Sequence, residues 1–197
     1  MDTTFDILQA IGLGLAFGLR PVLAPLVVAI CAAVNLAVDF EGTPFSFLEN
    51  PIVLAILAVV AVLGIVESGR AARGKGTFDA RGWLVLALVF GGLFGAGSVA
   101  EHSDSWFIGA IVGVIAAGLG WAATNPLVAG ARKRLEGEPE ASLILPAVVE
   151  LIAVVTAFLS LVFPPLAVIA LVAVLVLLVR GRKTAGESYA GLRTLSK

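Results

Sequence analysis

Residues 18–25 have the sequence GLRPVLAP and lie in the middle of the first apolar segment of the chain, residues 7–38. That segment has 32 residues, whereas a straight helix crosses a bilayer core with about 20. Pro21 and Pro25 each remove a backbone donor and clash with the preceding helical turn. We therefore expect the first helix, residues 5–38, to be either tilted with a proline kink or discontinuous, with its broken backbone lining a cavity enclosed by protein.

Arg20 is the only charged side chain in this apolar segment. An arginine near the middle of a span costs about 2.5–3.5 kcal/mol on insertion scales, and it normally faces the bundle interior or a water-filled cavity and has a partner. Glu150 lies early in a later apolar segment and enters from the same side of the membrane. We predict that it pairs with Arg20 or faces the same cavity. Alternatively, Arg20 only ties helices together through carbonyl groups or one carboxylate.

The composition indicates an all-α integral membrane protein. Hydrophobic residues make up 59% of the chain and charged residues 14%, well below the charged share of about 25% in soluble proteins. The apolar segments predict six transmembrane helices in one domain, residues 1–180, followed by a polar cytoplasmic tail, residues 181–197. The predicted helices are residues 5–38, 51–68, 82–100, 106–129, 143–162 and 166–179.

The connections between these helices alternate in charge. Residues 40–50, 101–105 and 163–165 contain no Lys or Arg, whereas residues 68–81, residues 130–142 and the tail contain several. Basic connections stay on the cytoplasmic side of a membrane. With six spans, this pattern places both the N-terminus and the C-terminus in the cytoplasm.

A weak internal repeat is present. A shift of 100 residues aligns residues 10–19 with 110–119 at several identical positions, and after one inserted residue Pro25 aligns with Pro126. Chance matches are common in a chain this rich in Ala, Gly, Leu and Val. If the repeat is real, halves of about 5–100 and 105–180 would each hold three spans and would be inverted, which is the plan of many transporters.

Closely spaced glycines occur in the third and fourth predicted helices. Gly91 and Gly95, and Gly109 and Gly113, fit the small-xxx-small spacing that brings helices into close contact. The spacing is compatible with packing inside one chain or between chains.

Two further polar residues are candidates for a site. Glu67 ends the second predicted helix, where it lines a pathway or simply pairs with nearby cations at the interface. Asn125, before Pro126, marks a break in the fourth helix or merely caps or bends it.

The sequence contains few residues and motifs of the kinds that catalyse reactions or bind metals. We therefore expect a protein that is not an enzyme and that binds no metal or cofactor. Cys31 is the only cysteine and His102 the only histidine. His102, beside Glu101 and Asp104, forms either a solvated polar turn or a weak metal site. No zinc-protease, phosphate-loop or nucleophile-elbow motif is present. The basic clusters are short and lie next to spans, so nucleic-acid binding is not expected.

Four short motifs resemble a bacterial family of small membrane proteins, domain-of-unknown-function family 4126. The motifs are Gly18-Leu19-Arg20-Pro21, Val66-Glu67, Val149-Glu150 and Tyr189-Ala190-Gly191-Leu192-Arg193. The resemblance implies a multi-span protein of the bacterial cytoplasmic (inner) membrane without an established activity. It adds interest to Arg20, Glu67, Glu150 and Tyr189 without giving them roles.

These features favour a transporter or channel-like protein in the lipid bilayer. The expected pathway for a small anionic or polar solute passes Arg20, Pro21 and Pro25 at the broken helix. Glu150, Asn125 and Glu67 complete the expected lining. The alternative is a non-catalytic scaffold or accessory subunit, whose buried charges are structural and which binds a partner membrane subunit or further copies of itself.

Overall fold

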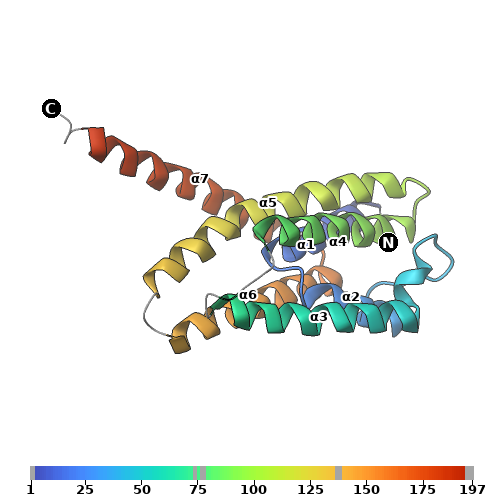
Figure 1. Cartoon of the computed structure of the whole chain (residues 1–197). Coiled ribbons are helices and arrows are strands. Elements are labelled where there is room, and N and C mark those ends of the chain that lie inside the picture. Colours follow the sequence, from blue (N-terminus) through green and yellow to red (C-terminus); the bar gives the residue numbers. More distant parts are fainter. Residues whose placement is uncertain (1–2, 73–74, 76–78, 136–138, 194–197) are drawn as a thin grey trace.

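The computed structural model describes residues 3–72, 75, 79–135 and 139–193, and in this part of the chain all regular structure is helical. The prediction of an all-α protein is confirmed (Figure 1). The elements are α1 (Thr3–Leu19), α2 (Ala24–Ala33), the short 3-10 helix η1 (Ser46–Glu49), α3 (Pro51–Ala72), α4 (Ala80–Ala100), α5 (Trp106–Arg134), α6 (Pro139–Val162) and α7 (Leu166–Arg193).

The number of spans differs from the prediction of six. Within the described residues, four helices are long and apolar enough to cross a bilayer: Pro51–Ala71, Ala80–Ala100, Trp106–Arg134 and Ile144–Val162. The predicted first span consists of two shorter helices, and the apolar part of α7, Leu166–Arg180, is also shorter than these four. The count of six is therefore wrong, although four of its members are confirmed.

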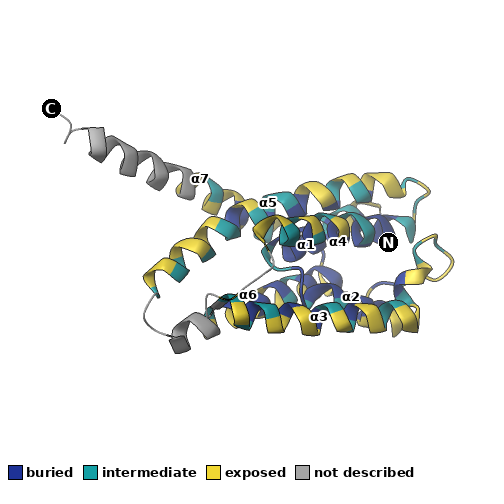
Figure 2. Cartoon of the chain, in the orientation of Figure 1, coloured by how far each residue is buried: buried dark blue, intermediate teal, exposed yellow. Residues whose placement is uncertain are grey.

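The outer surface of the bundle agrees with a membrane protein. Figure 2 shows α3 exposed along the side that faces away from the other helices. Large apolar side chains such as Ile52, Leu63 and Leu151 lie on such exposed faces. A soluble monomer rarely exposes apolar patches of this extent, so these faces indicate a lipid environment.

The first apolar segment forms a helical hairpin. α1 ends at Leu19, residues 20–23 form a turn, and α2 then runs back alongside α1 (Figure 1). The Gln9 side chain donates a hydrogen bond of 3.2 Å to the carbonyl of Ala37, which follows α2. The prediction of a discontinuous helix is confirmed. The second helix, α2, runs in the direction opposite to α1 and does not continue along the same axis.

Proline chemistry explains where this hairpin turns. Pro21 has no N–H with which to continue the α1 ladder. Pro25 lies in the first turn of α2, where a missing donor costs nothing because those N–H groups have no partner within the helix.

The hairpin also decides where the start of α1 lies in the bundle. The start of α1 lies beside the α4–α5 connection, where Asp6 Oδ2 is 3.4 Å from His102 Nδ1. α7 begins beside Gly12 and runs in the same direction as α1. The expectation that both termini lie in the cytoplasm stays a prediction.

Glycine lets α1, α4 and α5 pack closely at the centre of the molecule. Gly91 lies against Gly113, and Gly95 lies against Gly109. A methyl group on Gly95 would lie 2.5 Å from the carbonyl oxygen of Gly109. The small-xxx-small segments therefore pack against each other inside one chain.

The aligned halves of the repeat are not inverted. Residues 10–19 in α1 and 110–119 in α5 lie side by side and run in the same direction, with Gly14 next to Gly113 and Gly18 next to Gly120. An inverted repeat requires the two to run in opposite directions. α5 also continues through Pro126, so the break expected at Asn125 is absent from this described helix.

α7 extends further than the predicted last span. The helix continues to Arg193, so residues 181–193 of the predicted tail are helical, and residues 194–197 lie outside the described residues.

Candidate functional site

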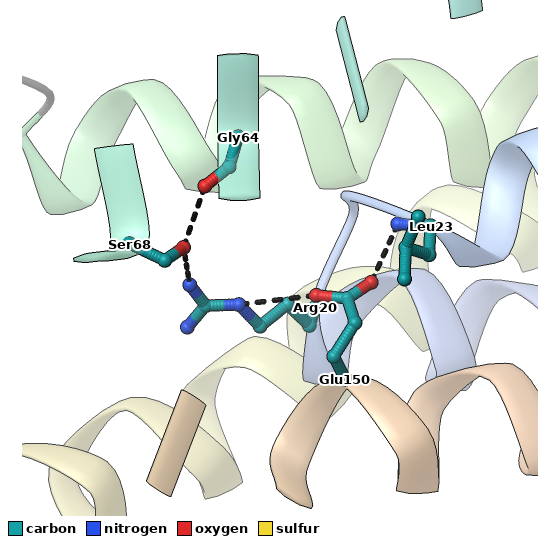
Figure 3. A network of polar contacts seen from close by, with 5 residues as sticks. All are labelled: Arg20, Leu23, Gly64, Ser68 and Glu150. Atoms are coloured by element: carbon teal, nitrogen blue, oxygen red, sulfur yellow. Dashed lines mark hydrogen bonds and ion pairs between the residues drawn. The ribbon is translucent and has the colours of Figure 1, made fainter. Parts of the chain in front are cut away.

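Arg20 and Glu150 form an ion pair at the turn between α1 and α2. Arg20 Nε lies 3.2 Å from Glu150 Oε2, and the two side chains are only 14% and 8% exposed. The predicted pair is therefore confirmed. Figure 3 shows Glu150 reaching from α6 toward both the guanidinium group and the backbone of Leu23.

Glu150 also accepts a hydrogen bond at the N-terminal end of α2. Its Oε1 accepts a hydrogen bond of 2.5 Å from the N–H of Leu23. Leu23 is the N-cap residue of α2, and its own side chain makes no capping hydrogen bond. The N-terminus of a helix carries partial positive charge because its first N–H groups have no partner within the helix. One carboxylate thus balances both the arginine and the helix end that the broken backbone exposes.

Arg20 is also held by α3 and α4. Its Nη2 donates to Ser68 Oγ, and the Ser68 hydroxyl donates in turn to the carbonyl of Gly64 at 2.6 Å (Figure 3). The Trp83 ring centroid lies 5.8 Å from Arg20 Cζ, which is within the range of a cation–π interaction. The side chain therefore connects the hairpin turn to three other helices.

These contacts correct the predicted depth of Arg20. Ser68 lies near the last turn of α3 and Trp83 in the first turn of α4, so the guanidinium group lies at the level of the helix ends and not at mid-span. Ser68 and Trp83 were not predicted as partners.

A polar cavity of about 150 Å³ lies beside the hairpin turn. Its lining includes four of the six predicted site residues, together with two tryptophans and a second arginine. These residues are Arg20, Pro21, Glu67, Asn125, Trp83, Trp121 and Arg132. We call this space the polar cavity. Of the other two predicted residues, Glu150 reaches Arg20 from α6, and Pro25 is buried in the first turn of α2, outside this lining.

Arg132 is the charged cavity residue that the sequence did not identify as part of a site. It lies in the last turn of α5 and was counted only among the charges of a basic connection. Its Nε is buried and makes no hydrogen bond to the described residues. An orphaned buried donor is costly, and this one belongs to a residue that lines the polar cavity.

A second, larger space meets the polar cavity at Arg20 and Ser68, which line both. It has a volume of about 500 Å³ and lies between α3 and α6. Its walls are formed mainly by Val22, Leu23, Ile65, Pro146, Ala147, Leu151 and Val154, and Glu150 also lines it. We call this space the apolar groove.

The opposite end of the bundle carries a separate group of charges. Asp6 and His102 approach each other there. Burial raises the pKa of the adjacent Glu101 carboxyl group, and the charges of Asp6 and Asp39 add to this rise, whereas His102 and a hydrogen bond from the Asp39 backbone oppose it. Within the described residues no group of three or more His, Cys, Asp and Glu side chains is placed to hold a metal ion.

Comparison of the chain with protein-family models, with curated proteins and with solved structures finds no match. The resemblance to domain-of-unknown-function family 4126 therefore stays a prediction. Tyr189, which that resemblance singled out, lies in the part of α7 whose side chains fall outside the described residues.

Proposed function

We propose that this protein is a transporter or channel-like membrane protein that moves a small anionic or polar solute past the Arg20–Glu150 pair. One observation carries the proposal: a broken helix, a polar cavity and a buried ion pair occur together at the hairpin turn. Discontinuous helices whose N-termini face anionic groups form the binding sites of many transporters.

Glu150 explains how such a site would be controlled. It occupies the position between a guanidinium group and a helix N-terminus, which is where an anion would bind. An entering anion and the Glu150 carboxylate would compete for the same donors, so the carboxylate would act as an internal gate.

We place the protein in the bacterial cytoplasmic membrane, with the basic end of the bundle toward the cytoplasm. This end contains Arg70 in the last turn of α3, Arg81 in the first turn of α4 and Arg132 in the last turn of α5, and basic segments stay on that side. The hairpin then puts the start of α1 on the opposite face. Single cysteines at Thr3 and at Lys75, introduced into a Cys31→Ser chain and labelled in intact cells, test this. Labelling of both positions from the same side would contradict it.

Flux measurements in liposomes test the transport function. We expect Arg20→Ala to abolish anion-dependent flux, because it removes a donor that would bind the anion. We expect Glu150→Gln to change the rate of flux and its dependence on anion concentration, because it removes the charge that competes with the anion for that donor. Arg81→Ala and Glu41→Gln remove exposed side chains of the same types and serve as matched controls. Arg20→Ala and Glu150→Gln proteins with wild-type flux would refute the mechanism.

A non-catalytic scaffold is the second candidate, because Arg20 and Glu150 link the hairpin turn to α3, α4 and α6. A stoichiometric membrane partner in the purified protein, together with an absence of flux for every anion tested, would favour this role.

A further inference from the structure

Resting on the proposed function, we propose that the solute is an amphiphile: a membrane phospholipid with a small anionic headgroup. Its phosphate would bind in the polar cavity, and one acyl chain would lie in the apolar groove. The juxtaposition of these two spaces, which share Arg20 and Ser68, carries the proposal.

The polar cavity offers donors that suit a phosphate. The Nε of Arg132 is buried and makes no hydrogen bond to the described residues. In Figure 3 the third nitrogen of the Arg20 guanidinium group points away from both Glu150 and Ser68. Arginine binds phosphate oxygens through paired N–H groups, so these donors would be used by a ligand in the cavity.

The size and charge of the cavity limit the headgroup. A volume of about 150 Å³ admits a phosphate with a small substituent. Glu67 also lines the cavity, and its carboxylate opposes the accumulation of negative charge. A headgroup with one or two negative charges therefore fits better than a polyphosphate.

The apolar groove fits a hydrocarbon chain. Its volume of about 500 Å³ falls within the range of about 300–1,000 Å³ that is typical of ligand pockets. Ile65 on α3 and Leu151 on α6 are 51% and 63% exposed, so the two walls continue into faces that we assign to lipid. A water-soluble anion would gain nothing from such a groove, whereas a lipid could enter it sideways from the bilayer.

The tryptophans support the same placement. Trp83 and Trp121 line the polar cavity, and tryptophan is enriched at the level of the lipid headgroups. A phosphate in this cavity would thus remain at headgroup depth while its chain follows the groove.

Fluorescence quenching tests the binding site. In a Trp106→Phe chain the remaining tryptophans are the two cavity residues. Phosphatidic acid with brominated acyl chains is titrated into this protein in detergent micelles, with brominated phosphatidylcholine as the control. We expect saturable quenching by phosphatidic acid, with an affinity at least about tenfold higher than for phosphatidylcholine. Equal quenching by both lipids would overturn the proposal.

Two variants separate the parts of the site. Arg132→Gln should weaken phosphatidic acid binding by about tenfold or more, and Arg132→Lys should recover part of it. Ala147→Phe should block the groove, whereas Val148→Phe, at an exposed position of α6 outside the groove lining, should not. If Ala147→Phe binds phosphatidic acid as the wild type does, the groove is not the chain site. That test stands even if Arg132→Gln fails to fold.

Two further measurements distinguish this proposal from the proposed function. If inorganic phosphate prevents quenching as strongly as unbrominated phosphatidic acid, and Ala147→Phe has no effect, the cavity is a site for small anions. This result would contradict the amphiphile proposal but not the proposed transport of a small anion. If phosphatidic acid binds as expected but neither lipid nor anion crosses liposome membranes, the binding site stands and transport falls.

Discussion

Two apolar segments of this chain contain a proline at matching positions of the repeat, and their backbones differ. Just before Pro25, at residues 20–23, the helix is interrupted and reverses direction, whereas α5 passes through Pro126 without a break. The interrupted segment has a second proline at Pro21 and a carboxylate from another helix, Glu150, that accepts the N–H of Leu23. In α5 the Thr124 hydroxyl donates to the carbonyl of Gly120, one turn earlier. Proline therefore permits a break in a helix, and an acceptor for the N–H groups exposed at the break stabilises it.

Removing that acceptor should have the largest effect. Glu150→Ala leaves Arg20 Nε and the Leu23 N–H without their partner, and breaking a buried ion pair costs about 3–5 kcal/mol. We expect a decrease of this size in the free energy of unfolding, measured by denaturation in mild detergent. Glu41→Ala removes an exposed carboxylate and is the control. If both variants are equally stable, the break does not depend on Glu150.

Replacing Pro25 and Pro126 one at a time tests whether proline has a different energetic cost at the two positions. Pro126 lies inside α5, where proline costs about 3 kcal/mol relative to alanine. Pro126→Ala should therefore raise the free energy of unfolding by roughly 1–3 kcal/mol. Pro25 lies in the first turn of α2, so Pro25→Ala should change it by less than about 1 kcal/mol. The opposite ranking in the same denaturation assay would mean that the two sites do not differ as described.

The parallel contact between α1 and α5 gives a smaller expected change. A methyl group on Gly14 would lie 2.5 Å from the carbonyl oxygen of Gly113, so Gly14→Ala should lower the melting temperature, with a loss of about 1–3 kcal/mol. Gly130 lies in the same α5 helix with no atom within 4 Å of an added methyl group, so Gly130→Ala should be neutral or stabilising. A stable Gly14→Ala protein would contradict the close packing of these helices.

The smallest effect concerns pH at the end of the bundle that lies away from the break. Burial raises the pKa of Glu101 above its ordinary value of about 4.3, so the folded state holds this proton more tightly than the unfolded state. Its stabilising contribution is complete below about pH 4.3 and is lost as the pH rises through the raised pKa.

Glu101→Gln imitates the protonated form and gives the measurement for this effect. We expect the variant and the wild type to be equally stable at low pH. The wild type should become less stable than the variant as the pH rises, by less than about 1 kcal/mol because the group is partly exposed. A difference between the melting temperatures that does not change with pH would rule out this effect.

Much of the candidate site could be predicted from the sequence, because a charge in an apolar segment must have a partner. That argument identified Arg20 and Glu150, and Glu67 and Asn125 line the same polar cavity. Arg132 could not be identified, because a basic residue next to a span has the same sequence signal whether it faces water or a cavity. Its burial depends on how the end of α5 packs.

The fold was predictable helix by helix, and its topology was not. The positions of α3, α4 and α5 follow from their apolar lengths, although α3 and α5 continue to Ala72 and Arg134, beyond the predicted ends at residues 68 and 129, and proline indicated a break after Leu19. The direction of α2 after the break depends on distant contacts, such as Leu23 with Glu150 on α6. The charge alternation did not reveal the hairpin, because residues 34–38 after α2 carry no charge.

The hairpin has a consequence for the synthesis of the protein. Arg20 leaves the ribosome 130 residues before Glu150, which corresponds to roughly 7–26 s at about 5–20 residues per second. Throughout that interval the tip of the hairpin is in or at the membrane without the carboxylate that later neutralises it. We therefore expect the guanidinium group of Arg20 to stay in the translocation machinery or among the lipid headgroups until α6 is synthesised and Glu150 can pair with it.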